Sequence, residues 1–201
     1  MKTIFSLVLL AGLPFFGQAQ SMDSHFGIKA GLNVATLDVK NGTDFNSKLG
    51  FHFGVLSHIH LSRYFAVQPE VVYSQQGGKD GSDRWKMNYI NVPVLLQIMA
   101  GDGFRIETGP QLGIKTSAKI KTGDIEVDNN DVSTLDFSWP IGVSYLSSTG
   151  LGLDARYNIG ISNVNDADFP KVHNRVFQVG LFYQFSGGGV TTTHTHHHSG
   201  R

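Results

Sequence analysis

The chain has 201 residues, 24 of them glycine and none cysteine, and its 16 Lys and Arg equal its 16 Asp and Glu in number. Without cysteine the chain makes no disulfide and carries no thiol nucleophile, and its balanced charge gives no basic surface that would indicate nucleic-acid binding. The glycine content favours strands and turns over long helices. Burial and strand pairing must therefore hold the fold together.

The first residues predict a secretory signal peptide over residues 1–19. A basic residue precedes an apolar run over residues 4–16, which Pro14 interrupts, and the small residue Ala19 follows where a signal peptidase would cut. An uncleaved anchor helix is the alternative, which the short run and the proline oppose. We therefore expect an exported chain with a single domain over residues 20–186.

Eight segments of this domain alternate between apolar and polar residues with the period of two that β-strands have. After removal of the signal peptide no run of about 18 apolar residues remains, so a membrane protein of this sequence would cross the bilayer with strands. The apolar rows lie within residues 26–34, 51–61, 64–73, 90–98, 104–114, 135–145, 151–161 and 177–185.

The opposite rows are polar and carry charges of both signs. In an outer-membrane barrel the apolar rows face lipid and the polar rows face the interior. The inverted arrangement is that of a secreted soluble lipocalin-like barrel that binds a small apolar ligand, and alternation alone leaves both open. The polar rows comprise Lys29, Glu70, Arg105, Glu107, Lys115, Asp136, Asp154 and Arg156, together with His52, His58, His60, Gln68, Gln97, Gln111, Asn33 and Asn158.

The connections between the segments alternate between long and short. Outer-membrane barrels place short turns at the periplasmic rim and long loops outside, whereas a soluble meander has no reason to keep this rule. The pattern favours an all-β fold, an eight-stranded antiparallel up-and-down transmembrane β-barrel in the outer membrane. The short connections are residues 62–63, 101–103 and 147–150, and the long ones lie around residues 38–48, 77–84, 115–131 and 163–174.

Five segments carry a family resemblance in their order along the chain. With them the chain resembles the PorT-type outer-membrane β-barrel family of Bacteroidetes, over essentially the whole expected domain. The resemblance implies an outer-membrane barrel of about eight strands. For most members it implies no reaction, and a few relatives assist protein secretion or gliding. The segments are residues 27–33 (GIKAGLN), 68–77 (QPEVVYSQQG), 89–93 (YINVP), 108–113 (TGPQLG) and 156–160 (RYNIG).

Charges on the interior rows need partners, because the lumen of an eight-stranded barrel is only wide enough for side chains and an unpaired buried charge is costly. We therefore expect a salt-bridge network that plugs the barrel, with no catalytic residue and no cofactor. A proton or ion path is the functional alternative. The predicted members of the network are Lys29, Glu70, Arg105, Glu107, Asp154 and Arg156.

Clustered histidines suggest metal binding when their spacing permits it. His52, His58 and His60 share a row, where we favour packing in the lumen because no carboxylate lies at obvious spacing. Residues 187–201 form a Gly/Thr/His-rich tail that is expected to be flexible. Its weak candidates for a metal site are His194, His196, His197 and His198.

A rim-located outer-membrane enzyme is the third alternative. His173 lies near Ser162, Asp166 and Asp168 in the last long connection, and outer-membrane hydrolases combine such residues at the barrel rim. One histidine near common loop residues is expected by chance. We therefore expect no enzyme.

The long connection after the fifth segment predicts an extended hairpin that offers an external contact surface. Its predicted turn is residues 122–123, so that Lys121 would face Asp124 and Lys119 would face Glu126. The expected partners of the barrel are outer-membrane lipid, the barrel-assembly machinery and an envelope or secretion protein.

Phe185 ends the apolar row of the last predicted strand. In related barrels the assembly machinery recognises a terminal aromatic residue on this face, so Phe185 is the expected assembly signal, although residues 186–201 follow it.

Replacing Phe185 with alanine should lower the amount of assembled barrel, whereas deleting residues 187–201 should not. The measurement is the fraction of envelope protein whose gel mobility changes on boiling. Normal assembly of the alanine variant would mean that Phe185 is only one more lipid-facing side chain.

Overall fold

The computed structural model describes residues 24–39, 46–80, 83–122, 125–128, 134–162 and 172–185. All regular structure in these ranges is strand, and they contain no helix long and apolar enough to cross a membrane. The expected signal peptide and tail lie outside the described residues. The strands are β1 (Ser24–Val39), β2 (Asn46–His60), β3 (Phe65–Asp80), β4 (Asp83–Ala100), β5 (Phe104–Thr108), β6 (Gln111–Thr122), β7 (Ile125–Asp128), β8 (Leu135–Leu146), β9 (Leu151–Gly160) and β10 (Val172–Gln184).

These ten strands occupy the eight strand positions of the barrel, here called walls. Two walls are interrupted, so each consists of two strands, β5 with β6 and β7 with β8. β5 and the first part of β6 pair with β4 in the same register, with Leu96 opposite Thr108 and Pro93 opposite Gln111, and the register of β6 shifts only further along, at Asn88 and Tyr89 of β4. Pro110 lies between β5 and β6, and its lack of an N–H interrupts the wall without shifting the register. β7 and β8 both pair with β6 and together make the next wall.

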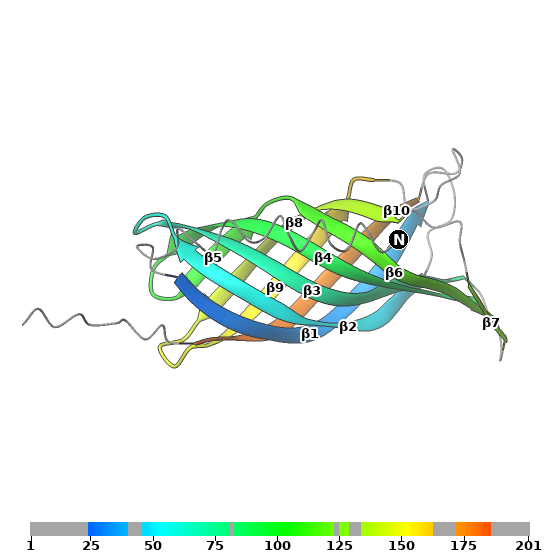
Figure 1. Ribbon diagram of the computed structural model, residues 1–201, viewed down its shortest axis with the longest axis horizontal. Coiled ribbons are helices and arrows are strands. Elements are labelled where there is room, and N and C mark those ends of the chain that lie inside the picture. Colours follow the sequence, from blue (N-terminus) through cyan, green and yellow to red (C-terminus); the bar gives the residue numbers. More distant parts are fainter. Residues whose placement is uncertain are drawn as a thin grey trace, which may run out of the picture.

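The sheet closes on itself (Figure 1). Each wall pairs antiparallel with the next along the chain, and β1 pairs with β10 from Gly27 opposite Gln184 to Val39 opposite Val172. Closure removes the open edges that a flat sheet would present. The predicted eight-stranded antiparallel up-and-down barrel is thus confirmed.

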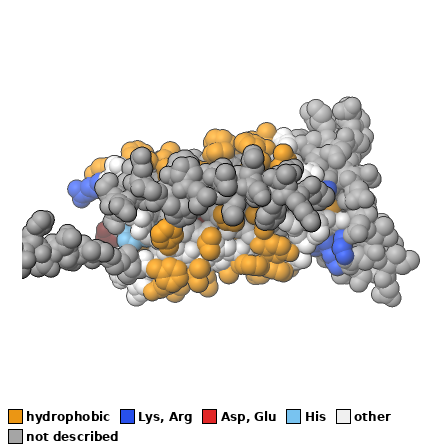
Figure 2. All heavy atoms as spheres, viewed as in Figure 1, with side chains coloured by type: hydrophobic (Ala, Val, Ile, Leu, Met, Phe, Trp, Pro, Cys, Tyr) orange, Lys and Arg blue, Asp and Glu red, His pale blue; other side chains and the backbone are white. Residues whose placement is uncertain are grey.

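The apolar rows cover the outside of the barrel. Phe53, Leu153 and Leu181 are 52%, 57% and 53% exposed, whereas Lys29 and Glu70 are 4% and 2% exposed. Figure 2 shows hydrophobic side chains over the middle of the barrel and Lys and Arg toward its two ends. A belt of this extent suits lipid and not water. The inverted arrangement of a soluble lipocalin-like barrel is therefore wrong.

Short turns join the strands at one end, as expected. Gly101, Gly103 and Gly150 lie in these turns with φ of 70°, 88° and 86°, a region that glycine adopts without steric cost. The opposite end differs from the expectation. In place of a loop over residues 77–84, β3 continues to Asp80 and β4 begins at Asp83, so the two strands extend as a hairpin.

The predicted hairpin after the fifth segment is present as β6 and β7, and it projects beyond the other walls in Figure 1. Its predicted register is wrong. Thr122 pairs with Ile125, and Lys121 lies opposite Glu126 instead of Asp124. The pairing thus leaves residues 123–124 between the two strands, one residue further along the chain than the predicted turn.

One aromatic ring inside the barrel packs directly against a glycine. Phe182 of β10 is 5% exposed and lies opposite Gly152 of β9. A Cβ atom on Gly152 would lie 2.2 Å from Cζ of the Phe182 ring. The glycine therefore provides the space that the ring occupies, and any side chain there must displace it.

Replacing Gly152 with alanine should lower the free energy of unfolding by about 1–3 kcal/mol, because the ring must leave its position in a filled interior. Urea unfolding of the refolded protein in detergent micelles measures this. Adding Phe182→Leu should recover much of the loss, and equal stabilities of Gly152→Ala and the unsubstituted protein would contradict the packing argument.

Candidate functional site

Charged side chains from four walls meet inside the barrel. Lys29 comes from β1, Glu70 from β3, Glu107 from β5, and Asp154 and Arg156 from β9. Strand alternation turns all five inward, and none is more than 4% exposed. Five of the six predicted network members are thus brought together.

Arg156 is the centre of this network. Its Nη1 and Nη2 atoms donate to the two carboxylate oxygens of Glu70 over 2.7 and 2.6 Å, and its Nε atom donates to Oε1 of Glu107. The planar guanidinium of β9 thereby joins carboxylates from β3 and β5 in fixed geometry. A lysine at this position would lack the fork that makes both contacts.

Lys29 links the remaining carboxylate to the network. Its Nζ atom lies 2.6 Å from Oδ2 of Asp154 and 3.4 Å from Oε2 of Glu70. Asp154 also lies 3.8 Å from Arg156. Two cations therefore meet three carboxylates, and one negative charge remains among these five groups.

Neutral side chains complete the hydrogen bonding of the two central carboxylates. Gln68 donates to Oε1 of Glu70 over 2.8 Å. Gln97 donates to Oε2 of Glu107 over 2.8 Å, and the Ser144 hydroxyl reaches the same oxygen over 3.4 Å. Such partners are what allows charges to remain buried.

Arg105 is the sixth predicted member, and it lies apart from the ion pairs. Among the described residues its recorded contacts are His58 Nδ1 at 3.5 Å and Gln184 Oε1 at 3.3 Å. Its charge balances the surplus of the other five groups, but it makes no ion pair within 4 Å in the described chain. Its place is nearer the end with the short turns.

A second polar cluster fills the barrel toward the long hairpins. His52 Nδ1 lies 2.7 Å from Asn33 Oδ1, which also accepts from Gln178 over 3.0 Å. The Asn33 amide donates to Ser74 over 3.0 Å, and Asn174 bonds with Gln76. The polar interior therefore continues on both sides of Arg156.

The barrel histidines whose side chains the structure describes form no metal site. The described residues hold no group of three or more His, Asp or Glu side chains that could bind a metal ion. His58 and His60 pack edge to face with ring centroids 4.5 Å apart, which is a packing contact. The tail candidates His194, His196, His197 and His198 lie outside the described residues.

The residues of the rim-enzyme alternative are only partly described. The Ser162 hydroxyl donates to Oδ1 of Asp136 over 2.7 Å and accepts from the Phe137 N–H over 2.7 Å. Asp166 and Asp168 lie outside the described residues, as does the side chain of His173. Ser162 therefore has a structural role at the start of β8.

Phe185 lies on the outer surface directly after β10. It is 47% exposed, its ring meets that of Tyr183 edge to face at 5.4 Å, and its N–H donates to the Phe26 carbonyl over 2.8 Å. The residue thus continues the pairing between β10 and β1 by one hydrogen bond. It also belongs to the apolar row that faces lipid.

The periodicity assigned the charged residues to the interior, but it gave no signal for two further features. The amide of Gln97 bridges Glu107 and His58, over 2.8 and 2.7 Å. Gly31 and Gly180 leave room for the His52 ring, because a Cβ atom on either would lie 2.7 or 3.1 Å from it. Both depend on which residues the closed register places side by side.

A family model described as outer membrane protein beta-barrel domain matches residues 16–166. Neisserial surface protein A is 19% identical with a TM-score of 0.60, over 80% of this chain and 97% of that one. Ail, the attachment invasion locus protein of Yersinia pestis, is 14% identical with a TM-score of 0.55, over 82% of this chain and 100% of that one. A structure of Ail in complex with the heparin analogue sucrose octasulfate is 13% identical with a TM-score of 0.52, over 82% of this chain and 100% of that one. No curated protein matches the chain. At these identities the solved structures show similarity of fold alone.

Replacing Arg156 with methionine should lower the free energy of unfolding by about 3–5 kcal/mol, because Glu70 and Glu107 would remain buried without their cation. The measurement is urea unfolding in micelles. Adding Glu70→Gln, which removes one of the stranded charges, should restore part of the loss. A control, Arg175→Met, changes an exposed arginine of β10 and should cost far less.

Proposed function

The chain belongs to the family of outer membrane protein beta-barrel domains, and we propose that it acts in the outer membrane as a sealed, non-enzymatic barrel. In this proposal its external hairpins contact a partner in envelope assembly or secretion. The observation that carries the proposal is the filled interior, in which Arg156 joins Glu70 and Glu107 across the lumen. A lumen filled in this way leaves no aqueous channel, so the surfaces available for function are the two rims of the barrel.

The external rim is the end with the long hairpins, because outer-membrane barrels keep short turns on the periplasmic side. A strand needs about 9–11 residues to cross the bilayer. β3 and β4 have 16 and 18 residues, whereas β9 has 10. One side of the barrel therefore extends well beyond the membrane and supports a role in contacting other molecules.

The extended strands place cations in neighbouring positions. Lys79 lies opposite Arg84, which lies opposite Lys121 on β6, and Lys86 lies opposite Lys119 in the next row. Like charges directly across a sheet are destabilising. On its other side β6 places Lys121 and Lys119 opposite Glu126 and Asp128 of β7, which offset part of this repulsion. We propose that these mixed but cation-rich rows contact a partner with an acidic or otherwise anionic surface.

A PorT-type member of the family is the finer assignment that we propose. It rests on the five segments of sequence that resemble that family, including residues 68–77 and 89–93, which lie on β3 and β4. Some relatives of this type assist protein secretion. We propose no catalytic residue, and the hydrogen bonds of Ser162 to Asp136 and Phe137 support its structural role.

We further propose that the barrel-assembly machinery recognises the end of β10 through Phe185. The side chain is exposed beside Tyr183 on the lipid-facing row, and its backbone continues the pairing with β1. It is therefore accessible before the barrel closes.

Capture of a partner from detergent-solubilised envelopes tests the external contact. The double variant Arg84→Gln, Lys121→Gln should capture severalfold less partner than the unsubstituted chain, and added salt or sucrose octasulfate should compete. A control, Arg63→Gln with Arg175→Gln, removes two cations elsewhere and should capture normally. Heat-dependent gel mobility verifies that all variants are folded. Equal capture by both double variants would contradict a role for the basic rows.

A further inference from the structure

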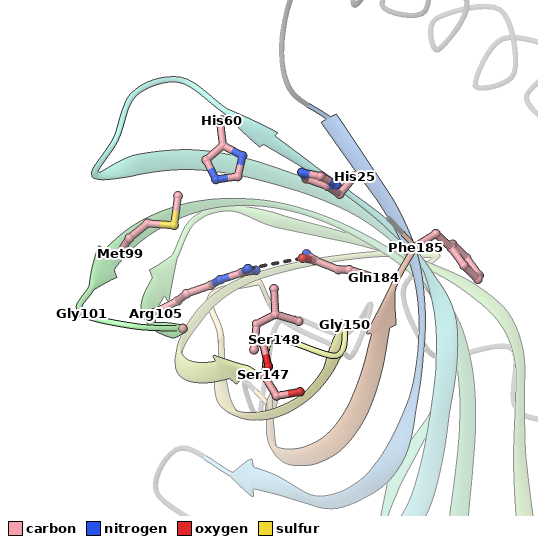
Figure 3. Close-up of a pocket in the computed structure, with 12 residues that line it drawn as sticks. His25, His60, Met99, Gly101, Arg105, Ser147, Ser148, Gly150, Gln184 and Phe185 are labelled. Atoms are coloured by element: carbon pink, nitrogen blue, oxygen red, sulfur yellow. Dashed lines mark hydrogen bonds between the residues drawn. The ribbon is translucent and has the colours of Figure 1, made fainter. Parts of the chain in front are cut away.

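A cavity of about 450 Å³ opens at the mouth of the barrel on the side of the short turns. Figure 3 shows Arg105 and Gln184 reaching toward one another across it, with His25 and His60 on one side and the turn of Ser147 and Ser148 on the other. No Asp or Glu belongs to the described residues that line it. This mouth is the periplasmic one, opposite the rim of the proposed partner contact.

Within the described residues the buried Arg105 has no ion pair, because the nearest carboxylate on its strand is already occupied. Glu107 accepts from Arg156 at one oxygen and from Gln97 and Ser144 at the other. A guanidinium carries five N–H donors and no acceptor. Arg105 therefore has to find acceptors elsewhere.

The neighbouring His58 does not supply one. Gln97 must direct its Nε2 atom at the Glu107 carboxylate, because only that atom donates, and its Oε1 atom consequently faces His58 Nδ1 over 2.7 Å. Two acceptors do not bond to each other, so His58 Nδ1 carries the proton. The 3.5 Å contact between Arg105 and this nitrogen therefore joins two donors.

One weak acceptor remains for Arg105 within the described residues, Gln184 Oε1 at 3.3 Å. The Nε2 atom of Gln184 is itself buried without a hydrogen-bond partner among the described residues. Both side chains are only 5% exposed, and both line the cavity. The buried wall of the cavity thus holds a cation and several unused donors.

We propose that this cavity is a binding site for a small oxyanion, a carboxylate or phosphate group that takes the donors of Arg105 and Gln184. A charged acceptor suits a guanidinium fork, and the cavity has room for a molecule larger than the bare ion. The site lies inside the mouth and not on the lipid-facing surface. Its ligand therefore comes from the periplasmic solution, and the site is independent of the proposed external partner.

Titration of the isotope-labelled full chain in zwitterionic micelles tests the site, with sodium phosphate and sodium acetate as separate probes and sodium chloride at equal ionic strength as the reference. Saturable shifts of the Arg105 Nε–H and Gln184 amide resonances are expected with at least one oxyanion and not with chloride. Arg105→Gln should weaken this binding about tenfold or more. Arg63→Gln, an exposed arginine at the same rim, should bind as the unsubstituted chain does.

Gln184→Glu provides a second test that does not remove the cation. Its carboxylate would take the place of the external anion beside Arg105, so oxyanion binding should be lost while the temperature of unfolding rises. Nanodiscs with and without anionic lipid identify the source of the oxyanion. Shifts that appear only with anionic lipid would mean that the ligand is a lipid headgroup and not a molecule from solution, and they would overturn the assignment. Absence of saturable shifts, or unchanged binding in either variant, would overturn the site itself.

Discussion

Backbone pairing between β1 and β10 is the constraint on which the other features of this molecule depend. Lipid offers no hydrogen-bonding partner to a strand edge, so a sheet in a membrane must close. Once eight walls close, every second side chain enters a space only as wide as the side chains themselves. The polar residues there must then satisfy one another. Arg156 does so by bonding carboxylates from β3 and β5 at once.

Buried ion pairs of this kind are better understood as specifying the register than as adding stability. Their Coulombic attraction is largely offset by the loss of hydration, while separating them is costly. A slip of one residue would turn Glu70 or Arg156 out toward lipid and apolar side chains into the lumen. The network therefore favours one pairing of the walls over its neighbours, and Lys29 extends that preference to the seam between β1 and β10.

The sequence allowed the walls and the direction of their side chains to be predicted, because period-two alternation is a local property. It did not allow the contacts across the lumen to be predicted, since these depend on how far each wall is staggered on closure. The charge and inward position of Arg105 predict a place among the ion pairs, yet Gln97 and Ser144 complete the hydrogen bonding of Glu107 instead. Residues 77–84 are rich in Gly, Asp and Ser, which indicates a loop, but pairing with the neighbouring strand keeps most of them extended.

The same seam has a consequence for the order of folding. The β3–β4 hairpin begins where Asp80 pairs with Asp83, whereas the seam joins Gly27 to Gln184 at the two ends of the domain. Loop-closure entropy makes the local hairpins form early and the seam last. Until it forms, β1 and β10 both present an unpaired edge beside an apolar face, the combination most prone to aggregation. The hydrogen bond from Phe185 to Phe26 lies at the end of this seam, so the nascent barrel must be protected until its first and last strands meet.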